Sequence, residues 1–343
     1  MKGGTTTVND AIWVVVLSYN GLDDTRKCLA SLEPALRPGT TALLVDNGST
    51  DGTADVVRTE FPWARVLRVE PNRGPAAGNN AGIRAALEGD CRWILLLNND
   101  TVVSANLLDR LREAVGADPS YGIIGPVIKF MGDPELVMTD GCIFNAPGYV
   151  GFFQRKPVPL TESAPPRITE VDVVNSCCIF VRSDVFRRIG LFDEGMFIYH
   201  DETDLCLRAR AAGVRAGIID HALVWHKGSA TAKATGRQST RYYDARNLLY
   251  VLRKHGGARR HGRSRLRSAA MYARYMYYWY CTELEAGSPR AAEAVIDGMC
   301  DGLSGRQGRY EEKRRALRAP IRAIFALLRR RPGRTSTASE AAR

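Results

Sequence analysis

The stretch Trp93-Ile94-Leu95-Leu96-Leu97-Asn98-Asn99-Asp100 joins an uninterrupted apolar run to three polar residues. A short run of large apolar residues is typical of a strand that is buried on both faces, as in a parallel sheet. The polar residues that follow lie where this strand meets solvent. Asp100 is therefore predicted to project a carboxylate from the end of a buried strand.

Three further strand-like runs precede this one, and helical patterns lie between them. The runs are Ile12–Leu17, Ala42–Val45 and Val66–Val69. Strands that alternate with helices predict a parallel sheet with helices on its faces, because parallel strands need crossover connections. The first hundred residues thus predict an α/β fold with a doubly wound, Rossmann-like, mainly parallel sheet.

Further along the chain, the many Pro and Gly residues of Lys129–Pro166 predict an irregular segment with a hairpin around Gly141–Phe153. Separate strands are expected near Val214–Ile219 and Ala222–Trp225.

Polar or glycine-rich segments follow three of the strands predicted in the first hundred residues. Ser18-Tyr19-Asn20-Gly21 follows the first, Asp46-Asn47-Gly48-Ser49 the second, and Asn98-Asn99-Asp100 the last. In open α/β sheets, ligands bind in the crevice outside the carboxyl ends of the strands. We therefore expect these three segments to converge on one ligand site.

Each polar segment has a functional and a structural interpretation. Asp100 could hold a hard cation together with a diphosphate, or it could be a loop residue that caps a helix near Ser104. Asp46 and Asn47 could pair with a base or a ribose, or form an ordinary capped turn. The small residues of Asn72–Gly82 permit close approach either of a ligand or of a helix to the sheet.

Three carboxylates stand within four residues at Asp201, Glu202 and Asp204, ahead of an apolar helical pattern. Capping and the helix dipole account for one or two of them. The remaining carboxylate is a candidate general base, since an attacking hydroxyl must lose its proton as the new bond forms. His226 ends the last strand-like segment and is either a structural histidine or part of the site.

Charge is distributed unevenly along the 343 residues, whose net charge is +11. Met1–His226 holds 22 Lys/Arg against 28 Asp/Glu, whereas Lys227–Arg343 holds 26 against 9. So basic a region predicts an anionic partner. Within Arg314–Arg331, apolar residues recur at helical spacing among arginines, which predicts either docking on an anionic membrane or packing on the rest of the chain or a second subunit. The aromatic-rich segment Met271–Tyr280 is expected to be core.

Two further observations concern the compartment. No run approaches the roughly 20 apolar residues that span a bilayer, so we expect a cytoplasmic protein. The eight cysteines include no Cys-x-x-Cys pair and lie among apolar residues, so they are expected to be reduced core residues rather than disulfides or a zinc site.

In this order, these segments resemble the family-2 glycosyltransferases, which have the GT-A fold, and within them the bacterial rhamnosyltransferase-like group. The resemblance covers roughly Ile12–Gly228 and is weaker in Arg241–Asn247. The matching stretches are Val14–Asn20, Val45–Gly52, Asn72–Gly82, Leu96–Asp100, Gly190–Glu194, Phe197–Cys206 and Val224–His226.

The resemblance implies an inverting, metal-assisted transfer of a sugar from a nucleotide-sugar to an acceptor hydroxyl. It implies Glu202 or Asp201 as the base, and Asp100 with His226 at a Mg²⁺ or Mn²⁺ ion. The residues implied to border the nucleotide are Ser18, Tyr19, Asp46, Asn47, Arg73, Gly74, Asn79 and Asn99. Two departures stand out: Asn98 replaces the first acid of the family's Asp-x-Asp motif, and the acid pair Asp201-Glu202 is reversed, with Glu202 favoured by position.

We therefore expect a GT-A catalytic domain over 10–228, a helical basic region over 229–332 and a disordered tail over 333–343. The expected donor is a dTDP-, UDP- or GDP-sugar, and the acceptor is a glycan, a lipid-linked saccharide or a natural product. A homo-oligomer and attachment to the inner face of an anionic membrane are open expectations. A nucleotidyltransferase is the rival enzyme, and a nucleic-acid-binding protein, for which we expect no support, is the non-catalytic rival.

Overall fold

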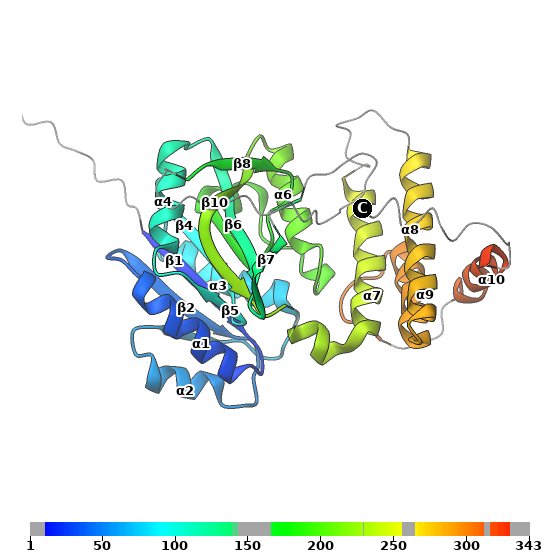
Figure 1. Ribbon diagram of the computed structural model, residues 1–343, viewed down its shortest axis with the longest axis horizontal. Helices are drawn as coiled ribbons and strands as arrows, with labels where there is room; N and C mark the ends of the chain where they lie inside the picture. The colour runs from blue at the N-terminus through cyan, green and yellow to red at the C-terminus, as the bar shows by residue number, and fades with distance from the viewer. Residues whose placement is uncertain are drawn as a thin grey trace, which may run out of the picture. The chain divides into compact units, whose positions relative to one another are not determined.

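The computed structural model describes residues 11–139, 141–142, 166–228, 230–255, 265–311 and 316–329. These residues belong to two units (Figure 1). The first unit comprises Met1–Ile143, Gly151–Phe197 and Asp201–Gly228, and the second comprises Phe144–Val150, Ile198–His200 and Ser229–Arg343. The expected hairpin at Gly141–Phe153 falls mostly outside the described residues, and the tail expected over 333–343 lies wholly outside them.

The first unit is built on one mixed sheet, in the order β3-β2-β1-β4-β9-β6-β10-β5, with β7 paired to β6 and β8 to β10. The first four strands in this order are parallel, as are β6 and β10, and the remaining pairs are antiparallel. The strands are β1 (Ile12–Ser18), β2 (Thr40–Asp46), β3 (Arg65–Arg68), β4 (Trp93–Asn98), β5 (Thr101–Val103), β6 (Tyr121–Phe130), β7 (Asp133–Thr139), β8 (Ile168–Val171), β9 (Cys178–Arg182) and β10 (Arg215–His226).

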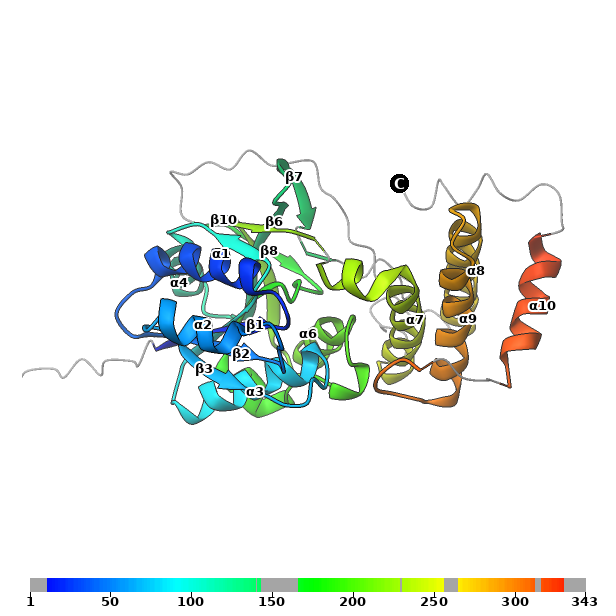
Figure 2. The same ribbon diagram turned by 90° about the horizontal axis from the view of Figure 1, so that it is seen from below.

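Helices cover both faces of this sheet (Figure 2). They are α1 (Leu22–Leu32), α2 (Thr53–Glu60), α3 (Pro75–Glu88), α4 (Leu107–Ala117), α5 (Ser183–Ile189) and α6 (Asp201–Ala211), with short 3₁₀ turns at Glu33–Ala35 and Glu194–Met196. Alternate residues of β1 point to opposite faces. Val14 and Val16 pack in the core that includes Leu29 of α1, and Val15 faces α3.

The glycines of α3 are explained by packing. A Cβ added at Gly78 or Gly82 would collide with the side chains of Leu17 or Val15, respectively. The helix therefore lies so close to β1 that only glycine fits at these two positions. Pro75 occupies the first turn of α3, as expected for a residue without a backbone N–H.

Two sequence expectations for the sheet need correction. The separate strands expected at Val214–Ile219 and Ala222–Trp225 form one strand, β10, whose pairing with β6 shifts register between Ile219 and Leu223. The segment expected to be irregular after Lys129 contains β7, which pairs with β6. Both differences involve β6, which pairs with β7, the strand that directly follows it, and with β10, which is distant in the sequence.

The second unit contains α7 (Ala230–Lys254), α8 (Arg265–Glu285), α9 (Pro289–Ser304) and α10 (Arg318–Arg329). Tyr272, Met276 and Tyr280 of α8 are buried, which confirms the prediction that this aromatic-rich stretch is core. The side chain of Glu283 is fully buried and paired with Arg237 and Arg241 of α7. Among the described helices, none has the length and apolar character needed to cross a membrane.

Candidate active site

The ends of β1, β2 and β4 bring the first predicted residues together. Ser18 is the register partner of Asp46, and Leu17 is that of Asn98. The Asn99 amide nitrogen donates to Ser18 Oγ at 3.2 Å and to Thr25 Oγ1 at 2.9 Å. Ser18 and Asn99 therefore fix the turn after β1 to the turn after β4, and Tyr19 beside them is 53% exposed.

Asp46 and Asn47 are both buried, and each has one oxygen without a hydrogen-bond partner among the described residues. Asp46 Oδ1 accepts from the Ser49 backbone N–H at 2.9 Å, and Oδ2 is unpaired. The Asn47 amide nitrogen donates to the Gly74 carbonyl at 3.1 Å, and its Oδ1 is unpaired. A buried polar atom without a partner costs about 1–3 kcal/mol, so these two oxygens are poised to accept hydrogen bonds from a ligand.

The start of α3 contacts the loop Phe192–Phe197, which includes the 3₁₀ turn at Glu194–Met196. Gly74 has φ +98°, and a Cβ there would lie 2.7 Å from Phe197 Cδ2. Arg73, whose side chain is 67% exposed, is 3.3 Å from the Glu194 carboxylate. Predicted Asn79 is buried in α3.

Asn80, which the sequence analysis did not single out, holds the same loop. Its amide nitrogen donates to the Phe192 carbonyl and to Glu194 Oε1, both at 3.0 Å, and its oxygen accepts from the Phe192 N–H. The hydrogen bond from Asn80, together with Arg84, lowers the pKa of Glu194 against the effect of partial burial. The only sign of this role in the sequence was that Asn80 is an amide among the small residues of Asn72–Gly82. Its partners lie more than a hundred residues away in the sequence.

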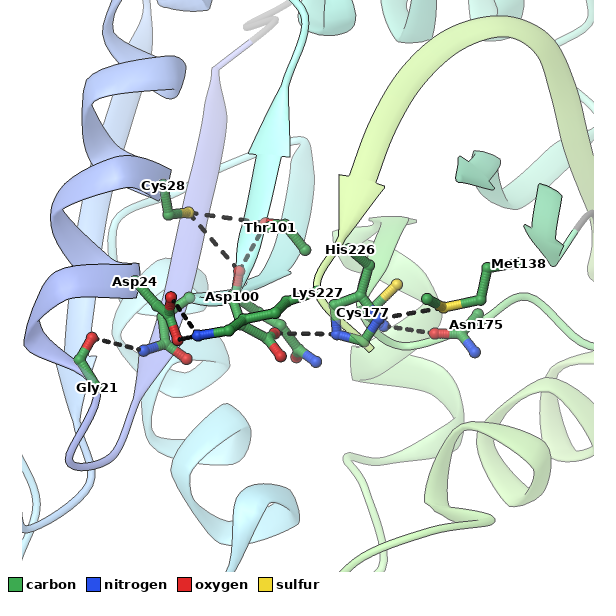
Figure 3. Close-up of polar contacts among 12 residues, drawn as sticks. Gly21, Asp24, Cys28, Asp100, Thr101, Met138, Asn175, Cys177, His226 and Lys227 are labelled. Atoms are coloured by element: carbon green, nitrogen blue, oxygen red, sulfur yellow. Dashed lines mark hydrogen bonds and ion pairs between the residues drawn. The ribbon is translucent and has the colours of Figure 1, made fainter. Parts of the chain in front are cut away.

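Asp100 and His226 face each other across the ends of β4 and β10 (Figure 3). His226 Nε2 is 2.9 Å from Asp100 Oδ1, and its Nδ1 is 3.3 Å from Met138 Sδ. The pairing arises because β5, which follows Asp100 directly, runs antiparallel to the end of β10, with Thr101 opposite His226. Asp100 is 8% exposed, so its carboxylate is largely withdrawn from bulk water.

A second ion pair, also missed by the sequence analysis, lies beside this one. The Lys227 ammonium is 2.9 Å from both oxygens of Asp24, and the Lys227 N–H donates to the Asp100 carbonyl. The hydrogen bond to Asp24 raises the pKa of Lys227. Lys227 thus ties the end of β10 to the first turn of α1, next to the Asp100 carboxylate (Figure 3).

Asp100 and His226 are suited to supply two of the ligands of a divalent cation. Such a cation would need further oxygen ligands. Carboxylate oxygen suits Mg²⁺ and Mn²⁺, and imidazole is a ligand for transition metals. Within the described ranges, no three or more His, Cys, Asp or Glu residues are grouped to hold a metal. The remaining ligands would therefore come from a bound diphosphate or water. Seven of the eight cysteines are buried, which agrees with the core position expected for them.

The acids at the start of α6 have different roles. Asp204 is fully buried and pairs with Arg208 Nε at 2.8 Å, and Arg208 also donates to the carbonyls of Ile189 and Leu191. Asp204 is therefore structural. Asp201 and Glu202 are also buried. The pKa of the Cys177 thiol is raised, first by burial and further by the negative charges of Asp100 and Glu202, so both carboxylates neighbour this thiol.

The residues before α6 have an unusual backbone. Phe197, Tyr199 and His200 have φ near +65°, a region that costs side-chain-bearing residues about 1–3 kcal/mol each. Asn247 of α7 donates from its amide nitrogen to the carbonyls of Ile198 and Tyr199, both at 2.8 Å. Asn247 therefore stabilises the strained turn before Asp201. It belongs to Arg241–Asn247, the segment in which the resemblance to the family is weaker.

Solved structures with this fold support the assignment of the architecture. The GalNAc-T7 structure with UDP, GalNAc and Mn²⁺ aligns with a TM-score of 0.54 and 14% identity, over 71% of this chain and 47% of that longer one. A Pyrobaculum calidifontis mannosyltransferase with GDP-Man and Mn²⁺ aligns with a TM-score of 0.53 and 16% identity, over 94% and 81%. The chain therefore has the GT-A fold, as predicted.

Curated relatives give a closer comparison. An N-acetylglucosaminyl-diphospho-decaprenol L-rhamnosyltransferase of Mycobacterium tuberculosis is 27% identical over 73% of this chain and 87% of its own length. The dTDP-rhamnosyl transferase RfbF of Shigella flexneri is 26% identical over 72% and 81%. The model of the family "Glycosyl transferase family 2" matches residues 13–190. Since that match covers more than half of the sequence, the chain belongs to glycosyl transferase family 2, and its relatives place it in the rhamnosyltransferase-like group.

Proposed function

We propose that this glycosyltransferase moves rhamnose from a dTDP donor to a hydroxyl of a lipid-linked saccharide, with inversion at the anomeric carbon. The observation that carries the proposal is the arrangement along one sheet edge. Two unpaired buried acceptors at Asp46 and Asn47 lie after β2, and the Asp100–His226 pair lies after β4 and β10. The names of the relatives from Mycobacterium tuberculosis and Shigella flexneri support the choice of rhamnose and of a lipid-linked acceptor.

The donor nucleotide would bind at the ends of β1 and β2. Asp46 Oδ2 and Asn47 Oδ1 would accept hydrogen bonds from a base N–H or a ribose hydroxyl, which would satisfy both atoms. The exposed ring of Tyr19 offers a stacking surface for the base. The guanidinium of Arg73 is exposed and lies 3.3 Å from the Glu194 carboxylate. It would leave Glu194 and bind a phosphate oxygen of the donor instead.

Asp100 and His226 would hold Mg²⁺ or Mn²⁺ against the donor diphosphate. When bound, the cation would neutralise charge that develops on the departing phosphate oxygen. The chain's own contribution is to orient the two ligands. Met138 and the pairing of β5 with β10 fix the His226 ring, and Lys227 binds the Asp100 backbone.

The acceptor hydroxyl would attack in a single displacement. Its oxygen forms a bond to the anomeric carbon as the bond to the phosphate oxygen breaks, and the nucleoside diphosphate leaves with the electron pair. The hydroxyl proton passes to a carboxylate, for which Glu202 is our first candidate and Asp201 the alternative. One displacement inverts the anomeric centre.

Product analysis tests this proposal. The full chain is incubated with dTDP-rhamnose, Mn²⁺ and a short polyprenyl-diphosphate-linked N-acetylglucosamine. We expect release of dTDP and a product whose new glycosidic bond has the inverted configuration. Formation of a nucleotide-sugar and pyrophosphate from dTTP and a sugar 1-phosphate, with no transfer from dTDP-rhamnose, would instead indicate a nucleotidyltransferase. Turnover with retained configuration would overturn the single displacement.

The donor can be identified separately. Thermal-shift screening of dTDP-, UDP- and GDP-sugars, with and without Mn²⁺, compares affinities without requiring the acceptor. We expect the largest stabilisation from dTDP-rhamnose with the cation, because binding to the folded state raises its apparent stability. A larger shift with a UDP- or GDP-sugar would replace rhamnose in the proposal and leave the transferase assignment intact.

A further inference from the structure

Helix α10 is attached to the second unit by one side. Phe325 is buried, and its ring lies 5.3 Å from that of Tyr277 and 5.2 Å from that of Tyr280. Arg318 Nε is 3.1 Å from Glu293, and Arg322 bonds the same carboxylate. For the apolar residues of Arg314–Arg331, both membrane docking and packing on the chain were open expectations, and Phe325 packs on the chain.

The other side of α10 is apolar and exposed. Ile324, Leu327 and Leu328 are 54%, 64% and 44% exposed, and Leu317 just before the helix is 43% exposed. At 3.6 residues per turn, Leu327 lies about 160° around the helix from Phe325. Apart from three arginines, α10 contains only Ala, Pro, Ile, Phe and Leu.

This distribution is the reverse of that on an ordinary surface helix. A helix at the surface of a soluble protein usually turns its polar residues outward and its apolar residues inward. In α10, Arg318 and Arg322 bond Glu293 of α9, while leucine and isoleucine side chains lie on the exposed side. Contiguous exposed apolar side chains mark a surface for binding.

Charge in the flanking sequence identifies the partner. From Lys313 to Arg334 the chain has nine Lys/Arg residues and no Asp or Glu. A second copy would bring two such segments together and be repelled, whereas an anionic lipid surface is complementary to them. We propose that the exposed side of α10, formed by Leu317, Ile324, Leu327 and Leu328, inserts into the interface of an anionic membrane, to which the positive charge of this part of the sequence attracts it.

Insertion of this kind needs both an apolar side of the helix and nearby positive charge. An apolar helix side buries a few side chains at the boundary of headgroups and acyl chains, and basic residues add attraction to an acidic leaflet that salt screens. The binding does not depend on which sugar is transferred. Membrane binding would, however, bring the enzyme to the surface in which a lipid-linked acceptor is held. This benefit rests on the proposed function.

Vesicle co-sedimentation of the full chain tests the docking. Vesicles of phosphatidylcholine alone are compared with vesicles that also contain phosphatidylglycerol, at low and high salt. We expect pelleting with the anionic vesicles that weakens as salt rises, and little with the neutral ones. Equal pelleting with both would overturn the anionic preference.

A matched pair of variants tests whether vesicle binding depends on the α10 surface or on exposed leucines in general. Leu328 of α10 and Leu303 of α9 are each 44% exposed. We expect Leu328→Asp, and more strongly Leu327→Asp, to weaken binding to anionic vesicles by about tenfold or more, and Leu303→Asp to bind as the unmodified chain does. Unchanged binding by both α10 variants would refute the docking surface.

Two controls keep the test decisive. Circular dichroism and thermal unfolding verify that the variants fold, and dTDP release with a water-soluble acceptor reports activity independently of the membrane. Light scattering measures the oligomeric state. A dimer that Leu327→Asp converts to monomer, without vesicle binding by the unmodified chain, would show that α10 docks on a second copy and would overturn the membrane proposal.

Discussion

Two buried polar sites, one in each unit, differ in whether their oxygens are paired. In the first, Asp46 and Asn47 each keep one buried oxygen unpaired at the edge of the sheet. In the second, the buried carboxylate of Glu283 is paired with Arg237 and Arg241. Buried polar groups are costly unless they are satisfied, so the paired group supports the fold and the unpaired ones favour a ligand.

The starts of two helices also differ. Helix α6 begins with three buried carboxylates, Asp201, Glu202 and Asp204, of which Asp204 pairs with Arg208. Helix α9 begins instead with Pro289, which lacks a backbone N–H and so needs no hydrogen-bond partner there. Substitutions at the candidate site of the first unit should therefore change chemistry or donor binding, and those in the second unit should change stability or positioning.

The largest effect on turnover is expected from Glu202→Gln. Loss of the proton acceptor should lower kcat by roughly a hundredfold or more, with donor affinity little changed, because the amide is similar in size and cannot accept the proton. Steady-state kinetics and donor titration measure the two quantities. Asp201→Asn is the comparison variant, and a crippled Asp201→Asn beside a nearly normal Glu202→Gln would transfer the role to Asp201.

Asp100→Ala should abolish the part of donor binding that depends on a divalent cation. The expected loss of affinity in Mn²⁺ is about ten- to a hundredfold, and the fold should persist because the residue lies beyond the apolar strand. Calorimetric titration with the nucleotide-sugar, with and without Mn²⁺, is the measurement. Asp109→Ala, which removes a surface ion pair with Arg37, is the control, and unchanged affinity for Asp100→Ala would disprove the metal assignment.

Asn247→Ala should lower kcat by roughly tenfold with the donor KM unchanged. The change removes two hydrogen bonds from the turn that leads directly into Asp201, so the carboxylates behind it would be held less well. A purely structural role would instead lower thermal stability without this kcat-specific loss. An equal rise in donor KM would contradict the role in positioning the base.

Glu283→Gln should have the smallest effect on chemistry and a clear effect on stability. The hydrogen bonds from Arg237 and Arg241 lower the pKa of Glu283 despite the opposing effect of desolvation. A carboxylate whose folded pKa is below the unfolded value of 4.5 adds stability that is fully present above that pH and is lost as pH falls through the folded pKa.

Thermal unfolding as a function of pH measures this contribution. We expect Glu283→Gln to melt several degrees below the unmodified chain at neutral pH, since it leaves two arginines without their charged partner. The gap should narrow as pH falls below about 4.5 toward the lowered folded pKa, because the carboxylate becomes protonated first in the unfolded chain and then in the folded one. A gap that does not depend on pH would indicate a packing effect instead of the ion pairs.

Local pattern was enough to predict much of the first unit. Buried apolar runs such as Trp93–Leu97 specify parallel strands, and the polar residues after them lie together at one edge of the sheet, as expected. Local pattern did not predict the contacts between distant segments. The bond from Asn80 to Phe192 was missed, and the proximity of Asp100 to His226, 126 positions apart, was expected from the family resemblance alone, because it depends on how β10 enters the sheet.

The orientation of helix α10 was also not predictable from local pattern. Helical spacing correctly indicated an amphipathic segment, but periodicity alone does not say which side packs. That choice depends on Glu293 and on the rings of Tyr277 and Tyr280, which belong to other helices. Sequence pattern therefore predicts elements well, and contacts between elements poorly.

The buried cysteines have a consequence for how the protein reacts with oxidants and alkylating reagents. Burial raises the pKa of Cys91 to about 11 and that of Cys28 and Cys206 to about 12, so almost none of these thiols is ionised at neutral pH. The thiolate is the reactive form, and it must also be reached by the reagent. Cys281, the one cysteine that is only partly buried, is therefore the natural position for attaching a fluorescent probe to α8 without disturbing the sheet.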